Sequence, residues 1–291
     1  MYPFVKWAGG KRQLLPEIRM RYQSILSNSI TKYAEPFVGG GAVLFDILTV
    51  HRFKEAYISD INAELINAYR VIRDSTDTLI AELAMMQDLF LPLAKDARKA
   101  FYYKVRDEYN RICIRDDNIR KAALMIFLNK TCFNGLYRVN SKGLYNVPVG
   151  DYKSPVICDK DNLNAVSKAL KNVEIICGQF TDSEYFIDKN TLAYFDPPYR
   201  PLNVTSNFTS YTKLDFNDDE QIRLAGYIDY LSNKGVKIIL SNSDPKNENP
   251  YDEFFDNLYK KYKIERINAS RMINSDAKSR GKVSEIIVTN F

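Results

Sequence analysis

Short apolar runs alternate with amphipathic segments at both ends of the chain, and this alternation constrains the fold more than any other feature. Near the N-terminus the runs are KYAEPFV (32–38) and EAYISD (55–60), each followed by apolar residues at helical spacing. Strands that alternate with helices predict an α/β fold with a mostly parallel sheet covered on both faces. The later runs are VEIICG (173–178), LAYFDPPY (192–199), KIIL (237–240) and SEIIVTNF (284–291).

The middle of the chain has a different pattern, which predicts an insertion into the α/β fold. Residues 75–128 show helical spacing and many charges, and residues 129–152 combine polar, aromatic and basic residues with turn formers such as Asn134-Gly135. We expect this second stretch to form a hairpin or an ordered loop. The predicted organisation is a core of residues 1–72 and 160–291, with residues 73–159 inserted as a mostly helical and hairpin unit.

Two predicted strand ends carry residues that suit a ligand containing adenosine. The segment EPFVGGG (35–41) leads from a strand through glycines towards a helix, so that bare backbone N–H groups can approach a ligand. Asp60 ends the next strand, where an acid commonly accepts hydrogen bonds from ribose hydroxyls. The glycines do not match G-x-G-x-x-G, which argues against NAD. The alternative is a glycine-rich packing turn, with Asp60 as a helix N-cap.

The stretch LAYFDPPY places an acid directly after a buried run. Asp196 is followed by Pro197, Pro198 and Tyr199, and the prolines hold the carboxylate and the nearby carbonyls in fixed directions. Prolines donate no N–H, so the turn offers mainly acceptors, while the Tyr199 ring offers a stacking face. These residues fit an exocyclic amine on a flat base, such as adenine N6. The alternative is a proline-stiffened turn with a surface acid.

Taken in order, these motifs resemble those of the amino-methyltransferases that use S-adenosylmethionine. The resemblance is to the Dam and DpnM-type DNA adenine-N6 methyltransferases of the D12 class, and it covers nearly the whole chain. It implies a Rossmann-like methyltransferase domain with an inserted DNA-recognition domain. The segments that carry it are PFVKWAGGKRQLLP (3–16), PFVGGG (36–41), FNGLYRVNSKGLYNVP (133–148), DPPY (196–199), FTSYT (208–212), LSNS (240–243) and SRGKVSEIIVTNF (279–291).

The resemblance also implies an activity and a set of functional residues. The implied reaction moves a methyl group from S-adenosyl-L-methionine to N6 of adenine in double-stranded DNA, within GATC, after base flipping. The catalytic residues would be Asp196, Pro197 and Tyr199. The cofactor-binding residues would be Trp7, Lys11, Phe37, Gly39, Gly41, Asp60, Gln179, Phe180 and Asp196. The DNA-binding residues would be Lys6, Asn134, Leu136, Arg138 and Pro148, with Leu136 or Tyr137 as a wedge in the base stack.

Two positions depart from the pattern of the family. Gln179 stands in GQF where the family usually has GDF, whose acid contacts the cofactor adenine. Asp151 stands in GDY where close relatives carry an arginine, which replaces a positive charge near DNA with a negative one. We therefore expect these positions to affect the strength of cofactor binding and the strictness of sequence specificity.

Residues 206–212 are expected to form a loop over the target base.

Composition narrows the remaining possibilities. No two of the four cysteines have C-x-x-C spacing, and we interpret them as reduced, buried residues and predict no metal site. The single histidine, His51, makes histidine general-base chemistry a poor candidate. The formal net charge of +5 is compatible with nucleic acid without arguing for it. Neither a signal peptide nor a membrane-spanning run is visible, so we expect a cytoplasmic, nucleoid-associated monomer.

Two alternative functions remain open at this point. The first is the same chemistry on another acceptor, which would be N4 of cytosine or an RNA base, because the chemistry of the DPPY turn does not exclude it. The second is a non-catalytic DNA-binding protein that keeps the fold. A restriction-modification role would add a cognate endonuclease that acts separately on the same DNA.

Overall fold

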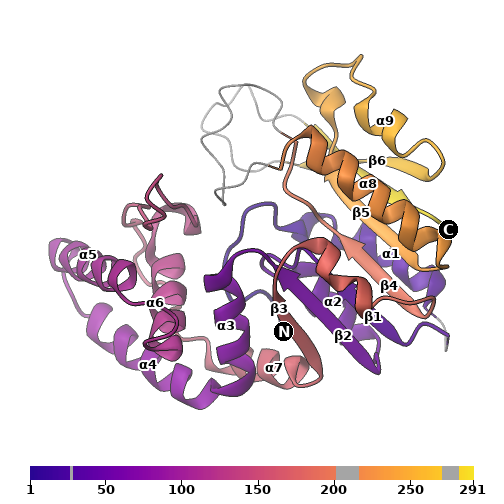
Figure 1. The fold of residues 1–291 in the computed structure, drawn as a ribbon. Helices are drawn as coiled ribbons and strands as arrows, with labels where there is room; N and C mark the ends of the chain where they lie inside the picture. Colours follow the sequence, from indigo (N-terminus) through magenta and orange to yellow (C-terminus); the bar gives the residue numbers. More distant parts are fainter. Residues whose placement is uncertain (27–28, 201–215, 271–281) are drawn as a thin grey trace.

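The computed structural model describes residues 1–26, 29–200, 216–270 and 282–291. These residues form a seven-stranded sheet in the order β3-β2-β1-β4-β5-β7-β6 (Figure 1). Neighbouring strands are parallel except at β7, which runs antiparallel to β5 and β6. The predicted α/β fold with a mostly parallel sheet is confirmed. The strands are β1 (Lys32–Glu35), β2 (Glu55–Asp60), β3 (Val173–Cys177), β4 (Thr191–Phe195), β5 (Lys237–Ser243), β6 (Lys263–Ser270) and β7 (Lys282–Thr289).

Helices cover both faces of the sheet. Successive residues along a strand point to opposite faces, and apolar residues occupy both. Tyr33 and Tyr194 join one buried cluster, whereas the next residues along the chain, Ala34 and Phe195, join a second. The first cluster is covered by α1 (Leu15–Ile25), α2 (Ala42–Val50), α3 (Ala63–Asp74) and α7 (Lys160–Leu170). The second is covered by α8 (Asp218–Asn233) and α9 (Phe254–Leu258).

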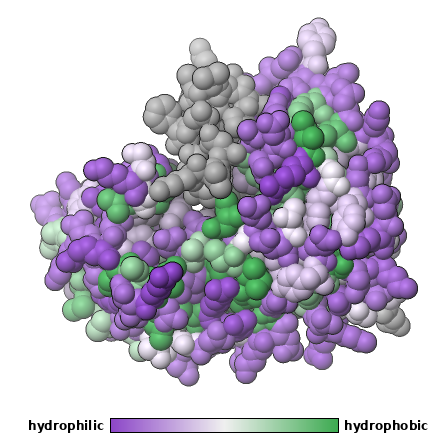
Figure 2. Space-filling model, in the orientation of Figure 1, coloured by the Kyte–Doolittle hydropathy of each residue, from purple (hydrophilic) through white to green (hydrophobic). Residues whose placement is uncertain are grey.

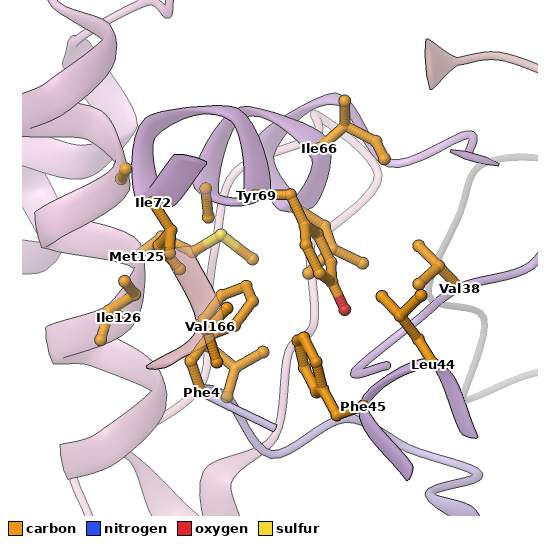
Figure 3. Packing of buried hydrophobic residues seen from close by; sticks show 14 of the residues in the cluster. Phe4, Val38, Leu44, Phe45, Ile66, Tyr69, Ile72, Met125, Ile126 and Val166 are labelled. Carbon is orange, nitrogen blue, oxygen red and sulfur yellow. The ribbon is translucent and has the colours of Figure 1, made fainter. Parts of the chain in front are cut away.

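The helical block that follows α3 shares its hydrophobic core with the first face of the sheet. It consists of α4 (Thr76–Phe90), α5 (Lys95–Arg111) and α6 (Asn118–Thr131). One buried cluster runs from the sheet through α3 into these helices, and Figure 3 shows Met125 and Ile126 of α6 near Ile72 of α3. The block is therefore attached through an apolar interface, and α3 is the element that joins it to the sheet.

Residues 132–150, which we call the recognition segment, form a compact loop after α6. Its chain begins with the short 3-10 helix η2 (Phe133–Gly135) and folds back through two antiparallel bridges, Cys132 with Val149 and Val139 with Tyr145. The predicted hairpin or ordered loop is present in this form. The proposed loop at residues 206–212, with its FTSYT motif, lies outside the described residues.

The cysteines differ from the sequence-based expectation in their exposure. All four are free, and Cys132 is buried while Cys158 is partly buried. The prediction of burial is wrong for Cys113 and Cys177, which are exposed. Cys113 lies in the connection between α5 and α6, and Cys177 is the last residue of an edge strand, which are both positions at the periphery of the packed elements. Within the described ranges no cluster of His, Cys, Asp and Glu is placed to hold a metal, and no helix could span a membrane.

Candidate active site

A cleft of about 1300 Å³ opens at the carboxyl ends of β1, β2 and β4, where ligands of open α/β sheets bind. Figure 2 shows apolar surface gathered between the helical block and the sheet. The structure brings together around this cleft every residue that sequence analysis assigned to catalysis or to the cofactor. They are Trp7, Lys11, Phe37, Gly39, Gly41, Asp60, Gln179, Phe180, Asp196, Pro197 and Tyr199.

The glycine turn between β1 and α2 is held in place by the core beneath it. Gly39 and Gly41 have φ values of 47° and 73°, in the left-handed region that favours glycine. The Tyr69 hydroxyl donates to the Gly39 carbonyl at 3.0 Å, and a Cβ at Gly41 would lie 2.5 Å from that hydroxyl. Figure 3 shows this tyrosine reaching from α3 towards Phe45 and Val38. The turn therefore requires glycine at position 41.

Asp60 fixes the other side of the same turn. The Gly39 N–H donates to its Oδ2 at 3.1 Å, and the Asn62 N–H donates to its Oδ1 at 2.9 Å. Burial raises the pKa of Asp60, and these backbone donors oppose the shift. The cap of α3 is Asn62, whose side chain accepts from the Leu65 N–H, so Asp60 is not the N-cap. Each Asp60 oxygen keeps a lone pair that can accept from a ligand hydroxyl.

Aromatic rings form one wall of the cleft. Phe37 stacks on Phe180 with ring centroids 5.5 Å apart, and Phe216 meets Phe37 edge-on at 5.6 Å. The Arg223 guanidinium lies 4.6 Å from the Phe180 ring centroid and donates to Gln179 Oε1 at 2.7 Å. Because a guanidinium can only donate, the amide oxygen of Gln179 must face Arg223. The amide NH2 group is then left to donate to a ligand.

Asp196 lies in a buried cluster of charged and polar groups at the end of β4. Lys11 Nζ is 2.9 Å from Asp196 Oδ1 and 3.2 Å from Glu285 Oε2, and it donates to the Tyr199 hydroxyl at 2.7 Å. Burial by itself would lower the pKa of Lys11, but these three neighbours raise it above its ordinary value. These neighbours therefore favour the ammonium form of Lys11, although only 3% of the residue is exposed.

Burial also raises the pKa values of the acidic groups in and beside this cluster. Burial raises the pKa of Asp196 above its ordinary value, and the charge of Lys11 partly opposes the shift. Burial likewise raises the pKa of Tyr199 to about 12, so that its phenol stays protonated at neutral pH. Glu35, which also lines the cleft, has its pKa raised well above the usual range because it is buried. Its Oε2 accepts a hydrogen bond from Tyr33 at 2.6 Å.

The DPPY turn is braced from below by side chains of β5 and α8. The Ser241 hydroxyl donates to Asp196 Oδ1 at 3.1 Å, and Gln221 Nε2 donates to the Pro198 carbonyl at 3.1 Å. Gln221 in turn accepts from Asn242 at 3.2 Å, and both of these side chains are fully buried. The turn therefore has a fixed backbone, as the prolines predict.

The recognition segment is anchored next to the cleft by one buried amide. Asn129 accepts from the Lys6 N–H at 2.8 Å and donates to the carbonyls of Lys6 and Gly135 at 2.8 and 3.0 Å. Trp7 stacks on Tyr137 with centroids 5.1 Å apart. These contacts join the N-terminal strip that lines the cleft to the recognition segment.

The residues predicted to contact DNA are presented at the surface of this anchored segment. Asn134, Leu136, Arg138 and Pro148 are exposed, as is the side chain of Lys6. The suggestion that Tyr137 could wedge into a base stack is wrong, because it is only 4% exposed and packs against Trp7. Leu136, which directly precedes Tyr137, is exposed and remains the candidate for a wedge in the base stack.

Sequence reasoning missed three side chains of the site, which are Glu285, Gln221 and Arg223. Glu285 lies within β7, in a segment that carries the resemblance but at a position to which it assigned no role, and Gln221 and Arg223 lie on α8, outside the motifs. Of these three, Gln221 carries a spacing signal, because position 221 falls on the buried face of α8 and holds a polar side chain. A buried polar residue on an apolar face indicates a specific partner.

Comparison with known proteins decides the family. A model described as D12 class N6 adenine-specific DNA methyltransferase matches residues 7–273. The chain belongs to this family. The resemblance inferred from the sequence is therefore confirmed, and the chain is an adenine-specific DNA methyltransferase by family.

Individual relatives of this methyltransferase match along almost their full lengths. The type II methyltransferase M.MjaIII of Methanocaldococcus jannaschii is 49% identical over 99% of this chain and 99% of its own length. The type II methyltransferase M1.LlaDCHI of Lactococcus lactis subsp. cremoris is 40% identical over 99% and 95%, respectively. The DNA adenine methylase of Escherichia coli K12 is 32% identical over 98% and 93%.

Proposed function

We propose that this methyltransferase transfers a methyl group from S-adenosyl-L-methionine to N6 of adenine in double-stranded DNA, within GATC, after flipping the target base. The observation that carries this proposal is the meeting of two half-sites in one cleft. One half-site is the glycine turn with Asp60 and the aromatic wall, and the other is the braced turn of Asp196, Pro197 and Tyr199.

The first half-site suits the adenosine part of the methyl donor. Asp60 would accept from the ribose hydroxyls, and the rings of Phe37 and Phe180 offer a flat apolar surface for adenine. Gln179 would donate to a ring nitrogen of the adenine edge, because Arg223 holds its amide oxygen. The donor set therefore fits the cofactor even though Gln179 replaces the acid of the family. Trp7 and Lys11 complete this part of the cleft.

The second half-site suits the amine that receives the methyl group. Within the part of the chain that the structure describes, both contacts to Asp196 go to Oδ1, so Oδ2 is available to accept from an amine. The Pro198 carbonyl already accepts from Gln221, which makes the Pro197 carbonyl the second acceptor. Accepting both amine hydrogens returns electron density to a nitrogen whose lone pair is delocalised into the ring. Tyr199 would stack on the flipped base.

The reaction needs little beyond this placement. When bound, S-adenosyl-L-methionine would supply an electrophilic methyl group on a sulfonium. The C–S bond would break as the N–C bond forms, S-adenosylhomocysteine would be the leaving group, and N6 would release one of its two protons to solvent. Fixed orientation of the reacting groups can remove about 7–11 kcal/mol of the barrier at best. Flipping the adenine costs a few kcal/mol of stacking, which contacts to the DNA must offset.

The recognition segment supports the DNA part of the proposal. Arg138 would read a guanine with two hydrogen bonds, and Asn134, Leu136, Pro148 and Lys6 would contact neighbouring positions of the duplex. In the free protein Arg138 Nε donates to Asn146 Oδ1 at 2.8 Å, so this contact would be exchanged for a base contact. GATC is the sequence that the resemblance implies for such a segment. The enzyme would act as a monomer, in the cytoplasm and on the nucleoid, alongside a separate cognate endonuclease if it serves restriction-modification.

The family match favours adenine over the alternatives of cytosine N4 and RNA bases. The alternative of a non-catalytic DNA-binding protein is disfavoured by the intact pairing of Asp196 with Lys11 and by a cleft that accommodates a cofactor.

The proposal is tested by incubating purified protein with duplex DNA and S-adenosylmethionine labelled in the methyl group. The DNA is then digested to nucleosides and examined by mass spectrometry. We expect labelled N6-methyladenine, and we expect GATC sites to gain resistance or sensitivity to endonucleases that read this modification. Asp196→Asn serves as the matched inactive control. Label in N4-methylcytosine, label only with RNA, or no binding of the donor would each refute the proposal.

A further inference from the structure

Lys11 presents an electrostatic problem for the proposed reaction. As the methyl group moves, positive charge passes from the sulfonium to the attacking nitrogen, which lies beside Asp196. Lys11 is a buried ammonium ion only 2.9 Å from Asp196 Oδ1, and a nearby cation opposes the development of positive charge. Lys11 and Asp196 alone would form a neutral pair, and that pair would give the nitrogen little stabilisation.

Glu285 supplies the missing negative charge. It lies in β7 opposite Ser243, the last residue of β5, and this pairing brings it to the carboxyl end of the sheet beside β4. Its Oε2 is 3.2 Å from Lys11 Nζ, and 17% of its side chain is exposed. The contact is an ion pair without hydrogen-bond geometry, since Oε2 is inaccessible to solvent and has no hydrogen-bond partner among the residues that the structure describes. Glu285 is not part of the described cleft lining, so it acts on the cleft through Lys11.

We propose that Glu285 is a positioning residue for methyl transfer, which holds the Lys11 ammonium and gives the cluster around Asp196 a net charge of minus one. This inference rests on the proposed function, because it concerns the charge that forms during that reaction. Two carboxylates, Asp196 and Glu285, then share one ammonium ion beside the place where positive charge develops. Lys11 can then hold Asp196 and Tyr199 in place without opposing the reaction.

A purely structural role for Glu285 would have a different consequence. If the ion pair only stabilised the fold, its loss would lower the free energy of unfolding but would not change the charge felt by a bound ligand. The distinguishing measurement compares two ligands of the same shape and different charge. S-adenosylhomocysteine has a neutral thioether, whereas sinefungin carries an ammonium group close to the position of the transferred methyl group.

The experiment measures the dissociation constants of both ligands by calorimetry for the wild-type protein and for Glu285→Gln. We expect the preference for sinefungin over S-adenosylhomocysteine to fall about tenfold in the variant, because one negative charge near the ammonium is lost. The single-turnover rate constant for methylation of a duplex should fall by roughly tenfold to a hundredfold. Affinity for the neutral ligand should change by less than about threefold.

Glu265→Gln is the matched control, because Glu265 is also a sheet glutamate paired with cations, at 3.2 Å from Arg21 and from Lys263. It lies in β6 and should leave the ligand preference unchanged. An unchanged preference in Glu285→Gln, with a folded protein by thermal melting, overturns this inference alone. Failure of the wild-type protein to bind either ligand overturns the proposed function instead. If Glu285→Gln does not fold, the same ratio is measured in Glu285→Asp, where it should stay near the wild-type value, and a tenfold fall there contradicts the inference.

Discussion

The cleft and the recognition segment present their side chains to ligands in opposite ways. In the cleft the charged groups are buried or partly buried and are bound to one another, as Lys11 is to Asp196 and Glu285. In the recognition segment the polar side chains are exposed, and the fixed part is the backbone behind them, held by Asn129 and by the stacking of Tyr137. The cleft therefore holds charged groups in fixed positions, whereas the recognition segment holds its backbone in a fixed position and leaves its polar side chains exposed.

This difference matches two different physical tasks. Stabilising charge in a reaction requires dipoles and ions that do not reorganise, and burial provides this. Reading a base sequence requires side chains that exchange their own contacts for contacts with DNA, as Arg138 would exchange Asn146. Substitutions in the cleft should therefore alter methyl transfer far more than DNA affinity, and substitutions in the recognition segment should do the reverse.

The largest effect is expected for Asp196→Ala. Removing the carboxylate deletes the proposed acceptor for the amine and leaves Glu285 as the charge partner of Lys11 within the described part of the chain. We expect the single-turnover rate constant to fall by at least about a thousandfold, while the dissociation constant for duplex DNA stays within about threefold. Rapid-quench assays and fluorescence anisotropy measure the two quantities. Retained activity would remove Asp196 from the mechanism, and lost DNA binding would break the division between the two regions.

The features of the cleft that could be predicted from the sequence are those that stand at the ends of strands. Asp60, Gly41 and Asp196 stand at or shortly after the ends of predicted strands, and the carboxyl ends of parallel strands meet at one edge of the sheet. Local pattern therefore places them in one site without any knowledge of strand order. The same reasoning predicted strands that match β1 to β5 and β7.

Glu285 could not be predicted in this way, because its role depends on strand order. In the sequence it is one polar residue in SEIIVTNF, and only the antiparallel insertion of β7 next to β5 brings it to Lys11. The strand β6, KIERINAS, was also missed, since it is a sheet edge with alternating charges and no apolar run. Both features depend on which strands pair in the folded sheet, and the periodicity of the sequence does not carry that information.

The backbone of the cleft provides the next test, through Gly41→Ala. The left-handed φ of 73° and the approach of a Cβ to within 2.5 Å of the Tyr69 hydroxyl should destabilise the fold by about 2–4 kcal/mol. Gly226→Ala is the matched control, because a methyl group added to this exposed glycine of α8 would meet no neighbouring atom within 4 Å. It should stabilise the fold by about 0.5–1 kcal/mol. Urea unfolding measures both, and similar values for the two variants would contradict a special role for the turn.

Arg138→Ala tests the recognition segment, whereas the two preceding variants test the cleft. We expect discrimination at one or two base pairs to relax by about 1–3 kcal/mol, with an unchanged rate constant for methyl transfer on saturated DNA. Competition binding with singly substituted duplexes measures this loss. Lys142→Ala is the control, since an exposed lysine of the same segment should weaken binding to all duplexes equally. An equal loss on all duplexes for Arg138→Ala would make it a phosphate contact.

The smallest effect is expected for Asp151→Ala, which removes a solvent-exposed ion pair, unlike the ion pairs of Lys11 in the cleft. Asp151 pairs with Lys95 at 3.0 Å, but the two side chains are 84% and 81% exposed, so the pair should add less than about 1 kcal/mol to stability. Its loss frees Lys95 for a phosphate, and the slope of log affinity against log salt should steepen by about one unit. Asp188→Ala, at the amino end of the strands and 3.0 Å from Lys32, should leave the slope unchanged. An unchanged slope in Asp151→Ala would mean that the surface next to the recognition segment lies outside the DNA contact, and that specificity depends on the exposed side chains of the segment itself.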